Sequence, residues 1–170
     1  GVTVTWKSVP GAAGYLVERK QGDEGWQRIK TVKGSGITRW MDSSNRSGER
    51  YGYRVRAYSG DNTSKASSAQ SITYLTAPKL AKLKNTGKRA VTVQWKKSSG
   101  ASGYQIYYGQ TSRFKKAKTV TISKEKSTKA VIKRLQKKKT YYVRIRTYQK
   151  VSGKNYYSNW SKTKTVTIRK

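Results

Sequence analysis

Apolar and polar residues alternate along two stretches of the chain, a pattern typical of strands with one buried face. The stretches are Arg50–Tyr58, RYGYRVRAY, and Thr140–Tyr148, TYYVRIRTY. In the second, the inward positions are Tyr141, Val143 and Ile145, and the outward positions are Tyr142, Arg144, Arg146 and Tyr148. We therefore expect two strands with one core-facing side and an opposite side that carries rings beside guanidinium groups.

The similarity between the two stretches extends along the chain. VTVTWK at Val2–Lys7 recurs as VTVQWK at Val91–Lys96, 89 residues later. GAAGY at Gly11–Tyr15 recurs as GASGY at Gly100–Tyr104 with the same offset. A repeat of about 90 residues indicates two copies of one structural unit.

We predict a first domain at residues 1–76 and a second at residues 77–170. In both, short alternating segments follow one another with turn residues between them and without long helical periodicity. This pattern favours an all-β fold in which each domain is a β-sandwich. Lys79–Lys84, KLAKLK, is expected to open the second domain, whereas the first copy begins at what should be its second strand. We expect the first copy's opening strand to lie upstream in a longer parent protein or to have been removed.

Several residues together resemble the fibronectin type III module. They are the tryptophans on the second strands, the Gly-Tyr pairs that enter the third strands, and a leucine six residues before a tyrosine: Trp6, Trp95, Tyr15, Tyr104, Leu135 and Tyr141. In that family the tyrosine closes a tyrosine corner. The first copy departs here, because the longer Trp40–Arg50 segment precedes Tyr51. The resemblance implies tandem sandwiches of the seven-strand type, the first without its opening strand, that serve in binding or spacing and seldom in catalysis.

The phrases FKKAKTVTI and YYVRIRTY are more specifically similar to lysine-rich modules repeated in surface or secreted proteins of Gram-positive anaerobic bacteria. This implies an extracellular or cell-surface location. The chain has no cysteine, and bacterial surface modules commonly lack disulfides. No apolar run approaches the length of a membrane span.

The charge of the chain is strongly basic and unevenly distributed. The net charge is +32, from 39 Lys and Arg against 7 Asp and Glu. Residues 1–77 hold 12 basic and 6 acidic residues, a net of +6, whereas residues 78–170 hold 27 and 1, a net of +26. Such a field attracts polyanions at long range, although lysine-rich surfaces also serve solubility.

We do not expect catalysis, a metal or a cofactor. The chain has no histidine or cysteine, so the commonest general base and the commonest thiol nucleophile are absent. Glu125 is the sole carboxylate of the second domain and cannot form a catalytic or calcium-binding pair. In the first domain, the turn carboxylates Asp23, Glu24 and Asp42 are expected to accept local hydrogen bonds.

The candidate binding face belongs to the second domain. Trp160 is expected on the last strand, where it can stack on Arg144 or Arg146, with Tyr107 on the same side. The SNWS run around Trp160 resembles half of the WSXWS signature of cytokine-receptor modules, in which such a stack is internal. Two interpretations stay open: an internal cation–π ladder, at about 0.5–1 kcal/mol per exposed contact, or a binding surface. In the first copy Glu18 and Ala66 take the positions of Tyr107 and Trp160, so an acid there can neutralise an arginine.

We predict that the second domain binds an anionic polysaccharide or cell-wall phosphate polymer electrostatically, while the first acts mainly as a spacer. The candidate ligand-binding residues are Tyr107, Tyr142, Arg144, Arg146, Tyr148 and Trp160 on the sheet face, and Arg113, Lys115, Lys116, Lys118, Lys137, Lys138 and Lys139 in loops. One alternative is an adhesin or receptor segment that binds a specific host protein through the aromatic and arginine face. Another is a pure spacer for an upstream enzyme. No signature of sequence-specific nucleic-acid binding is present.

Overall fold

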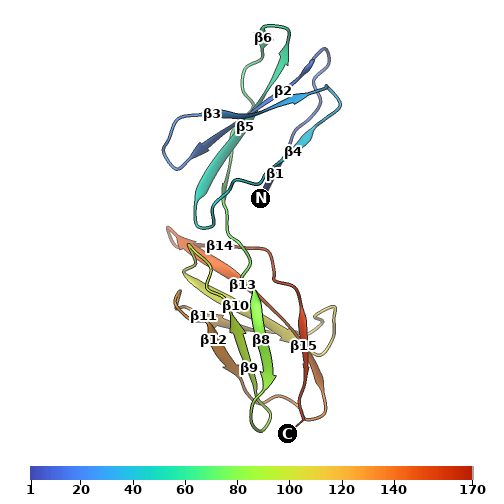
Figure 1. Cartoon of the computed structure of the whole chain (residues 1–170), viewed down its shortest axis with the longest axis vertical. Helices are drawn as coiled ribbons and strands as arrows, with labels where there is room; N and C mark the ends of the chain where they lie inside the picture. The colour runs from blue at the N-terminus through green and yellow to red at the C-terminus, as the bar shows by residue number, and fades with distance from the viewer. Residues whose placement is uncertain (170) are drawn as a thin grey trace. The chain divides into compact units, whose positions relative to one another are not determined.

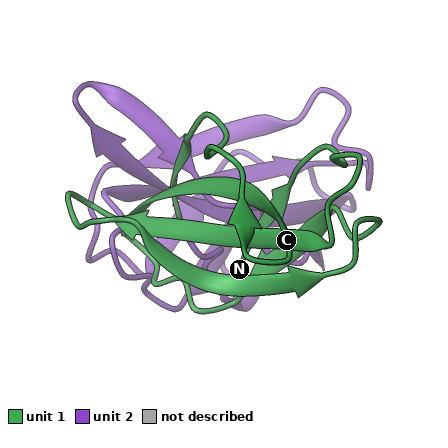
Figure 2. Ribbon diagram, turned by 90° about the horizontal axis from the view of Figure 1, so that it is seen from above, with its two compact units in different colours: residues 1–74 green, residues 75–170 purple. Residues whose placement is uncertain are grey.

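The chain forms two compact units in a computed structural model that describes residues 1–169. Unit 1 is Gly1–Tyr74 and unit 2 is Leu75–Lys170 (Figure 2). The division between the units falls two residues before the predicted boundary. Every regular element of the described residues is a β-strand (Figure 1). No helix that could cross a membrane occurs among residues 1–169.

Unit 1 is built from two antiparallel sheets. The smaller pairs β1 (Val2–Thr5) with β4 (Arg39–Asp42). The larger has the order β3-β2-β5-β6, and β7 also pairs with β5. Its strands are β2 (Gly14–Gln21), β3 (Gln27–Lys33), β5 (Arg50–Ser59), β6 (Asn62–Thr63) and β7 (Gln70–Thr73).

Unit 2 repeats this arrangement with one further strand in the smaller sheet. That sheet has the order β12-β9-β8, and the larger has the order β11-β10-β13-β14 with β15 also on β13. The strands are β8 (Leu80–Asn85), β9 (Val91–Trp95), β10 (Gly103–Gly109), β11 (Lys118–Ile122), β12 (Lys129–Ile132), β13 (Thr140–Val151), β14 (Lys154–Tyr157) and β15 (Lys164–Thr167). Strands β14 and β15 both pair with β13 and together form one interrupted strand along its edge. Counted in this way, the unit has the seven-strand plan.

The predicted inward faces form the cores of the sandwiches. In unit 2, Tyr141, Val143 and Ile145 of β13 pack with the inward residues of β9 and β10. In unit 1, Tyr51, Tyr53 and Val55 of β5 take the corresponding places. The predicted all-β sandwich fold is confirmed, because side-chain alternation decides which face of each strand is buried.

A tyrosine corner is present in both units. The Tyr141 hydroxyl accepts a hydrogen bond from the Gln136 backbone N–H at 3.0 Å. The Tyr51 hydroxyl accepts one from the Arg46 N–H at 2.9 Å, also five residues upstream. The expected departure of unit 1 is not found, because residues 43–49 and residues 133–139 form connections of equal length that return the backbone to the ring in the same way.

The course after β13 differs from the predicted strand over Asn155–Ile168. Ser158–Thr163 is not a strand, so Trp160 lies between β14 and β15. The hydroxyls of Ser158 and Ser161 accept hydrogen bonds from the N–H groups of Thr147 and Ile145, both at 3.0 Å. Serine side chains therefore replace part of the backbone ladder. Unit 1 does the same with Ser64 and Ser67 against β5.

Candidate functional site

Six side chains on the outer face of the larger sheet of unit 2 form an aromatic–arginine ladder. They are Tyr107, Phe114, Arg144, Arg146, Tyr157 and Trp160. The pairing of β10 with β13 sets Tyr107 directly opposite Arg144. The Arg144 guanidinium lies 4.2 Å from the ring centre of Phe114, 4.6 Å from that of Trp160 and 5.2 Å from that of Tyr107. Arg144 is thus surrounded by rings from three segments.

Arg146 occupies the next step of the ladder. Its guanidinium lies 3.8 Å from the Tyr157 ring centre and 4.4 Å from that of Trp160. It also donates two hydrogen bonds to Gln105 Oε1, at 3.0 and 2.8 Å. Burial lowers the pKa of Arg146, the Tyr157 hydroxyl opposes this, and the charge of Arg144 lowers it further. The group stays charged because an unperturbed arginine pKa lies far above neutral pH.

The rings of the ladder also stack on one another. Tyr107 lies 5.3 Å from Phe114 and 5.4 Å from Trp160 between ring centres, with interplanar angles of 21° and 26°. The faces of the rings and of the guanidinium groups therefore contact one another, which favours the internal-ladder interpretation. The predicted stacking of Trp160 on the arginines is found on both of them.

Tyr148 and Tyr142 differ from the rest of the predicted face. Tyr148 lies on the outer side of β13 but is only 7% exposed, so the prediction that it is available for binding was wrong. It stands opposite Gly103, and a side chain there would meet the Tyr148 hydroxyl at 2.7 Å. The absent side chain lets the ring fold onto the sheet. Tyr142 stands opposite Gly109 and is half-buried, beside the ladder but not one of its members.

Sequence reasoning missed three rings that cover arginines. Phe114 and Tyr157 belong to the ladder of unit 2, and Trp26 of unit 1 lies 4.3 Å from the Arg54 guanidinium. One signal was available, because Phe114 is the only phenylalanine of the chain and stands within a basic run. The positions of Trp26 and Tyr157 depend on how loops fold back.

Unit 1 neutralises its outward arginines with an acid, as predicted. Glu18 forms ion pairs with Arg54 and Arg56, the latter at 3.3 Å. Arg54 also contacts Trp26, so the contrast between an acid in one copy and rings in the other is less complete than expected. The two units therefore differ on this face in the carboxylate of Glu18, because unit 2 has Tyr107 at the corresponding position.

The basic loops of unit 2 show a second arrangement. Lys115, Lys116 and Lys118, at the end of the β10–β11 connection, line a pocket of about 600 Å³ together with Lys133 and Arg134, which follow β12. Sequence reasoning missed the last two because they adjoin the others only in the fold. Arg113 and Lys137–Lys139 are exposed but do not line this pocket.

Few of these cations are paired. Within the described part of unit 2 one ion pair occurs, between Lys97 and Glu125 at 3.9 Å, and both side chains are largely exposed. Unit 1 has three, although it carries fewer than half as many basic residues. The positive charge of unit 2 is therefore left largely uncompensated by the protein.

The buried carboxylate of unit 1 is structural. Asp42 accepts hydrogen bonds from Ser44, Asn45, Tyr53 and Arg19, the last at 2.7 Å. Burial raises the pKa of Asp42, but the hydrogen bonds from Ser44, Tyr53 and Arg19 outweigh this and lower it to about 2. Among residues 1–169, no group of three or more His, Cys, Asp or Glu side chains can hold a metal.

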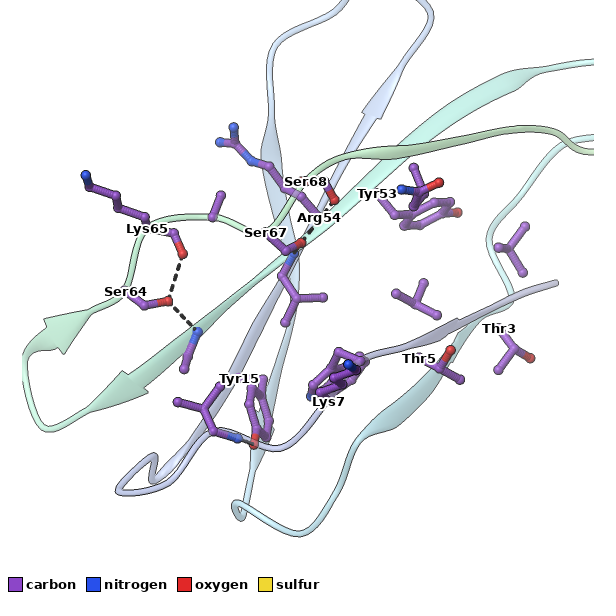
Figure 3. Close-up of a pocket in the computed structure, with 18 of the residues that line it drawn as sticks. Thr3, Thr5, Lys7, Tyr15, Tyr53, Arg54, Ser64, Lys65, Ser67 and Ser68 are labelled. Atoms are coloured by element: carbon purple, nitrogen blue, oxygen red, sulfur yellow. Dashed lines mark hydrogen bonds between the residues drawn. The ribbon is translucent and has the colours of Figure 1, made fainter.

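An apolar groove of about 780 Å³ runs along β1 of unit 1 (Figure 3). Val4 and Trp6 line it and are only half-buried, whereas the corresponding Val93 and Trp95 of unit 2 are 0% and 3% exposed. In unit 2, β8 pairs with β9 and covers these positions. The groove therefore marks the place that β8 fills in the second copy, and it holds no set of reactive side chains.

Known proteins share the fold of this chain. A model of the fibronectin type III domain matches residues 76–164. The FN1–FN3 domains of chicken CNTN1 are 24% identical, with 99% of this chain and 60% of that one covered and a TM-score of 0.48. A two-domain fibronectin type III segment of chicken tenascin is 15% identical, with 97% and 90% covered and a TM-score of 0.53. The chain thus spans about 60% of the CNTN1 segment, and the tenascin segment shares the tandem sandwich fold. No curated protein matches.

Proposed function

Because the chain belongs to the fibronectin type III family, we propose that it is a non-catalytic segment whose second unit binds an anionic polymer. Domains of this family are commonly binding or spacer modules and are generally not catalytic. Unit 1 then acts mainly as a spacer. The proposed setting is the surface of a bacterial cell or its surroundings, where wall polymers and host glycans are both anionic.

The observation that carries this proposal is the uncompensated charge of unit 2. Residues 78–170 hold 27 basic residues and one acidic residue, and that acid already faces Lys97. Self-repulsion of such a surface costs stability unless counterions or a polyanion neutralise it. A polymer that carries sulfate, carboxylate or phosphate groups releases its counterions on binding, which gives a large favourable free energy at low salt.

The ladder has a supporting part in this function. Its rings and guanidinium groups are engaged with each other, so it stiffens the sheet from which the basic loops extend. Exposed lysines make contact with anionic groups as point charges, without reading a sequence. The polymer is therefore selected by charge density and spacing more than by base or sugar identity.

The test measures binding of the whole chain to immobilised heparin and to a poly(glycerol phosphate), at about 0.05 M and about 0.5 M NaCl. We expect binding at low salt that falls steeply at high salt. Replacing Lys115, Lys116 and Lys118 with Gln should weaken it more than replacing Lys7, Lys30 and Lys33 of unit 1, which are also exposed.

Three results would contradict the proposal. They are absence of binding to both polymers, equal losses from the two sets of variants, and salt-resistant binding. A protein partner held at high salt and lost with Trp160→Ala or Tyr107→Ala would identify an adhesin instead, because buried aromatic anchors would then supply the affinity. No binding of any kind would leave a spacer.

A further inference from the structure

A basic pocket lies at one end of unit 2, between the β10–β11 and β12–β13 connections. Its cations are Lys115, Lys116, Lys118, Lys133 and Arg134, and all five residues are exposed. Its volume of about 600 Å³ falls within the range of about 300–1,000 Å³ found for pockets that hold small ligands. None of the five forms an ion pair within residues 1–169.

The wall of the pocket is held in place by neutral hydrogen-bonding groups. Gln110 Nε2 donates to Gln136 Oε1 at 2.8 Å and to the Tyr141 hydroxyl at 3.1 Å. The same hydroxyl accepts the Gln136 N–H of the tyrosine corner. This network ties one connection to the other, so the cations of both are kept on a common frame.

Each connection is also anchored by a buried apolar side chain next to its cations. Phe114, 8% exposed, packs into the ladder directly before Lys115 and Lys116. Leu135, 3% exposed, follows Arg134, and its backbone exchanges hydrogen bonds with Arg89 at 3.0 and 2.8 Å. The flexible lysines thus project from fixed backbone, which reduces the entropy lost when they bind.

The backbone at the pocket shows that cations stand where glycine is favoured. Residues 1–169 contain six non-glycine residues with positive φ, all in unit 2, and four are cations: Arg89, Lys116, Arg134 and Lys138. In unit 1 every described residue with positive φ is a glycine. The left-handed region is costly for residues with a Cβ and nearly free for glycine, and strain of this kind gathers at functional sites. Two of the four, Lys116 and Arg134, line the pocket.

Unit 1 supplies an internal comparison. Its β2–β3 connection, residues 22–26, corresponds to the longer β10–β11 connection, residues 110–117, and contains the carboxylates Asp23 and Glu24 instead of a run of lysines. After β4, the counterpart of β12, unit 1 has Ser43 and Ser44. The same fold therefore forms without a basic pocket, and the cations of unit 2 are not required by the sandwich.

We propose that this pocket binds one sulfate or phosphate ester group of the polymer, with its sugar or polyol against Gln110 and Gln136. The inference rests on the proposed function and adds a defined site to it: binding is concentrated in the pocket, and the remaining lysines contribute a diffuse field. The chemistry that the pocket recognises is the same in either case, a charged ester group. The experiment therefore distinguishes an ester on a glycan from an ester in a phosphate polymer.

The test compares two variants of the whole chain that each lose three charges. The pocket variant is Lys116→Gly, Lys133→Gln and Arg134→Gly, in which glycine relieves the left-handed backbone. The control is Lys82→Gln, Lys84→Gln and Lys129→Gln, three exposed lysines of the smaller sheet. Affinity is measured by calorimetry for a heparin hexasaccharide and for a glycerol-phosphate hexamer, and folding is followed by thermal unfolding.

We expect the pocket variant to lose at least tenfold in affinity for one of the two probes and the control to lose no more than threefold. The thermal midpoint of the pocket variant should be unchanged or higher, so that lost binding cannot be attributed to unfolding. The probe that shows the tenfold loss identifies the source of the ester.

Equal losses in both variants would overturn the pocket while leaving polyanion binding in place. A wild-type chain that binds neither probe would overturn the pocket and the proposed function together. A lower midpoint of the pocket variant would show that the two cations serve the fold and would overturn the inference from the backbone.

Discussion

Trp160→Ala removes the central ring of the aromatic–arginine ladder and should destabilise unit 2. Trp160 lies 4.6 Å from the Arg144 guanidinium and 4.4 Å from that of Arg146, and stacks on Tyr107 at 5.4 Å. Each cation–π contact contributes about 0.5–1 kcal/mol, and an aromatic pair about 0.5–1.5 kcal/mol. Because Phe114 and Tyr157 still cover the arginines, we expect a loss of about 2–3 kcal/mol in the free energy of unfolding.

Hydrogen exchange measured by mass spectrometry suits this test, because it reports each unit separately in the whole chain. Peptides from β13 should exchange faster in Trp160→Ala, whereas peptides from β5 in unit 1 should not change. Trp160→Phe keeps a ring between the two arginines and should cost less than half as much. Heparin affinity should change by less than threefold in both variants.

Two results would refute the reasoning. A loss below about 0.5 kcal/mol would show that the ladder does not stabilise the sheet, because that is the lower value for a single exposed contact. A tenfold loss of binding with unchanged exchange would show that Trp160 contacts the partner, and the face would then be a binding site.

Three further predictions concern other parts of the fold. The pKa of Asp42 is lowered to about 2 from 3.8, so its contribution of about 2 kcal/mol to unit 1 is present above pH 4 and is lost as the pH falls towards 2. Asp42→Asn should remove this acid dependence in an unfolding titration, whereas Asp23→Asn, in an exposed turn, should preserve it. Fusing a copy of Lys79–Ala90 ahead of Gly1 should raise the thermal midpoint of unit 1, since β8 covers the matching positions in unit 2. The expected rise is about 4–8 °C for each kcal/mol gained in the free energy of unfolding. An unchanged midpoint would show that the groove does not accept the strand. Gly103→Ala should destabilise unit 2 in chemical denaturation, because the new Cβ collides with the backbone carbonyl oxygen of Ile122 and also meets the Tyr148 hydroxyl at 2.7 Å. Gly36→Ala, with open space around it, should have little effect.

The candidate site was only partly predictable. Alternation along β13 placed Arg144 and Arg146 on the outer face. The repeat identified Glu18 as the acid that neutralises the matching arginines of unit 1. Phe114 and Tyr157 were not predicted, because their contacts depend on loops whose conformation short-range sequence patterns do not specify. Tyr148 was placed on the correct side of its strand but is buried, because the opposite residue happens to be glycine.

The basic pocket shows the same division. Lys115, Lys116 and Lys118 were identified as candidates from their own run, but Lys133 and Arg134 are about 15 residues further along the chain. Two connections come together only when β10, β12 and β13 have formed their sheets. The left-handed backbone of Lys116 and Arg134 is likewise a property of the closed turns.

The sequence by itself determined the strands up to β13, their inward faces, the two-copy organisation and the imbalance of charge. These are periodic or additive properties, since each residue contributes to them through its position in an alternation or through its own charge. Only the tertiary structure decided which rings cover which arginines, that Tyr148 is buried, and that five cations share one pocket. Those features depend on contacts between segments distant in sequence, and such contacts are fixed by strand register and loop closure, not by local pattern.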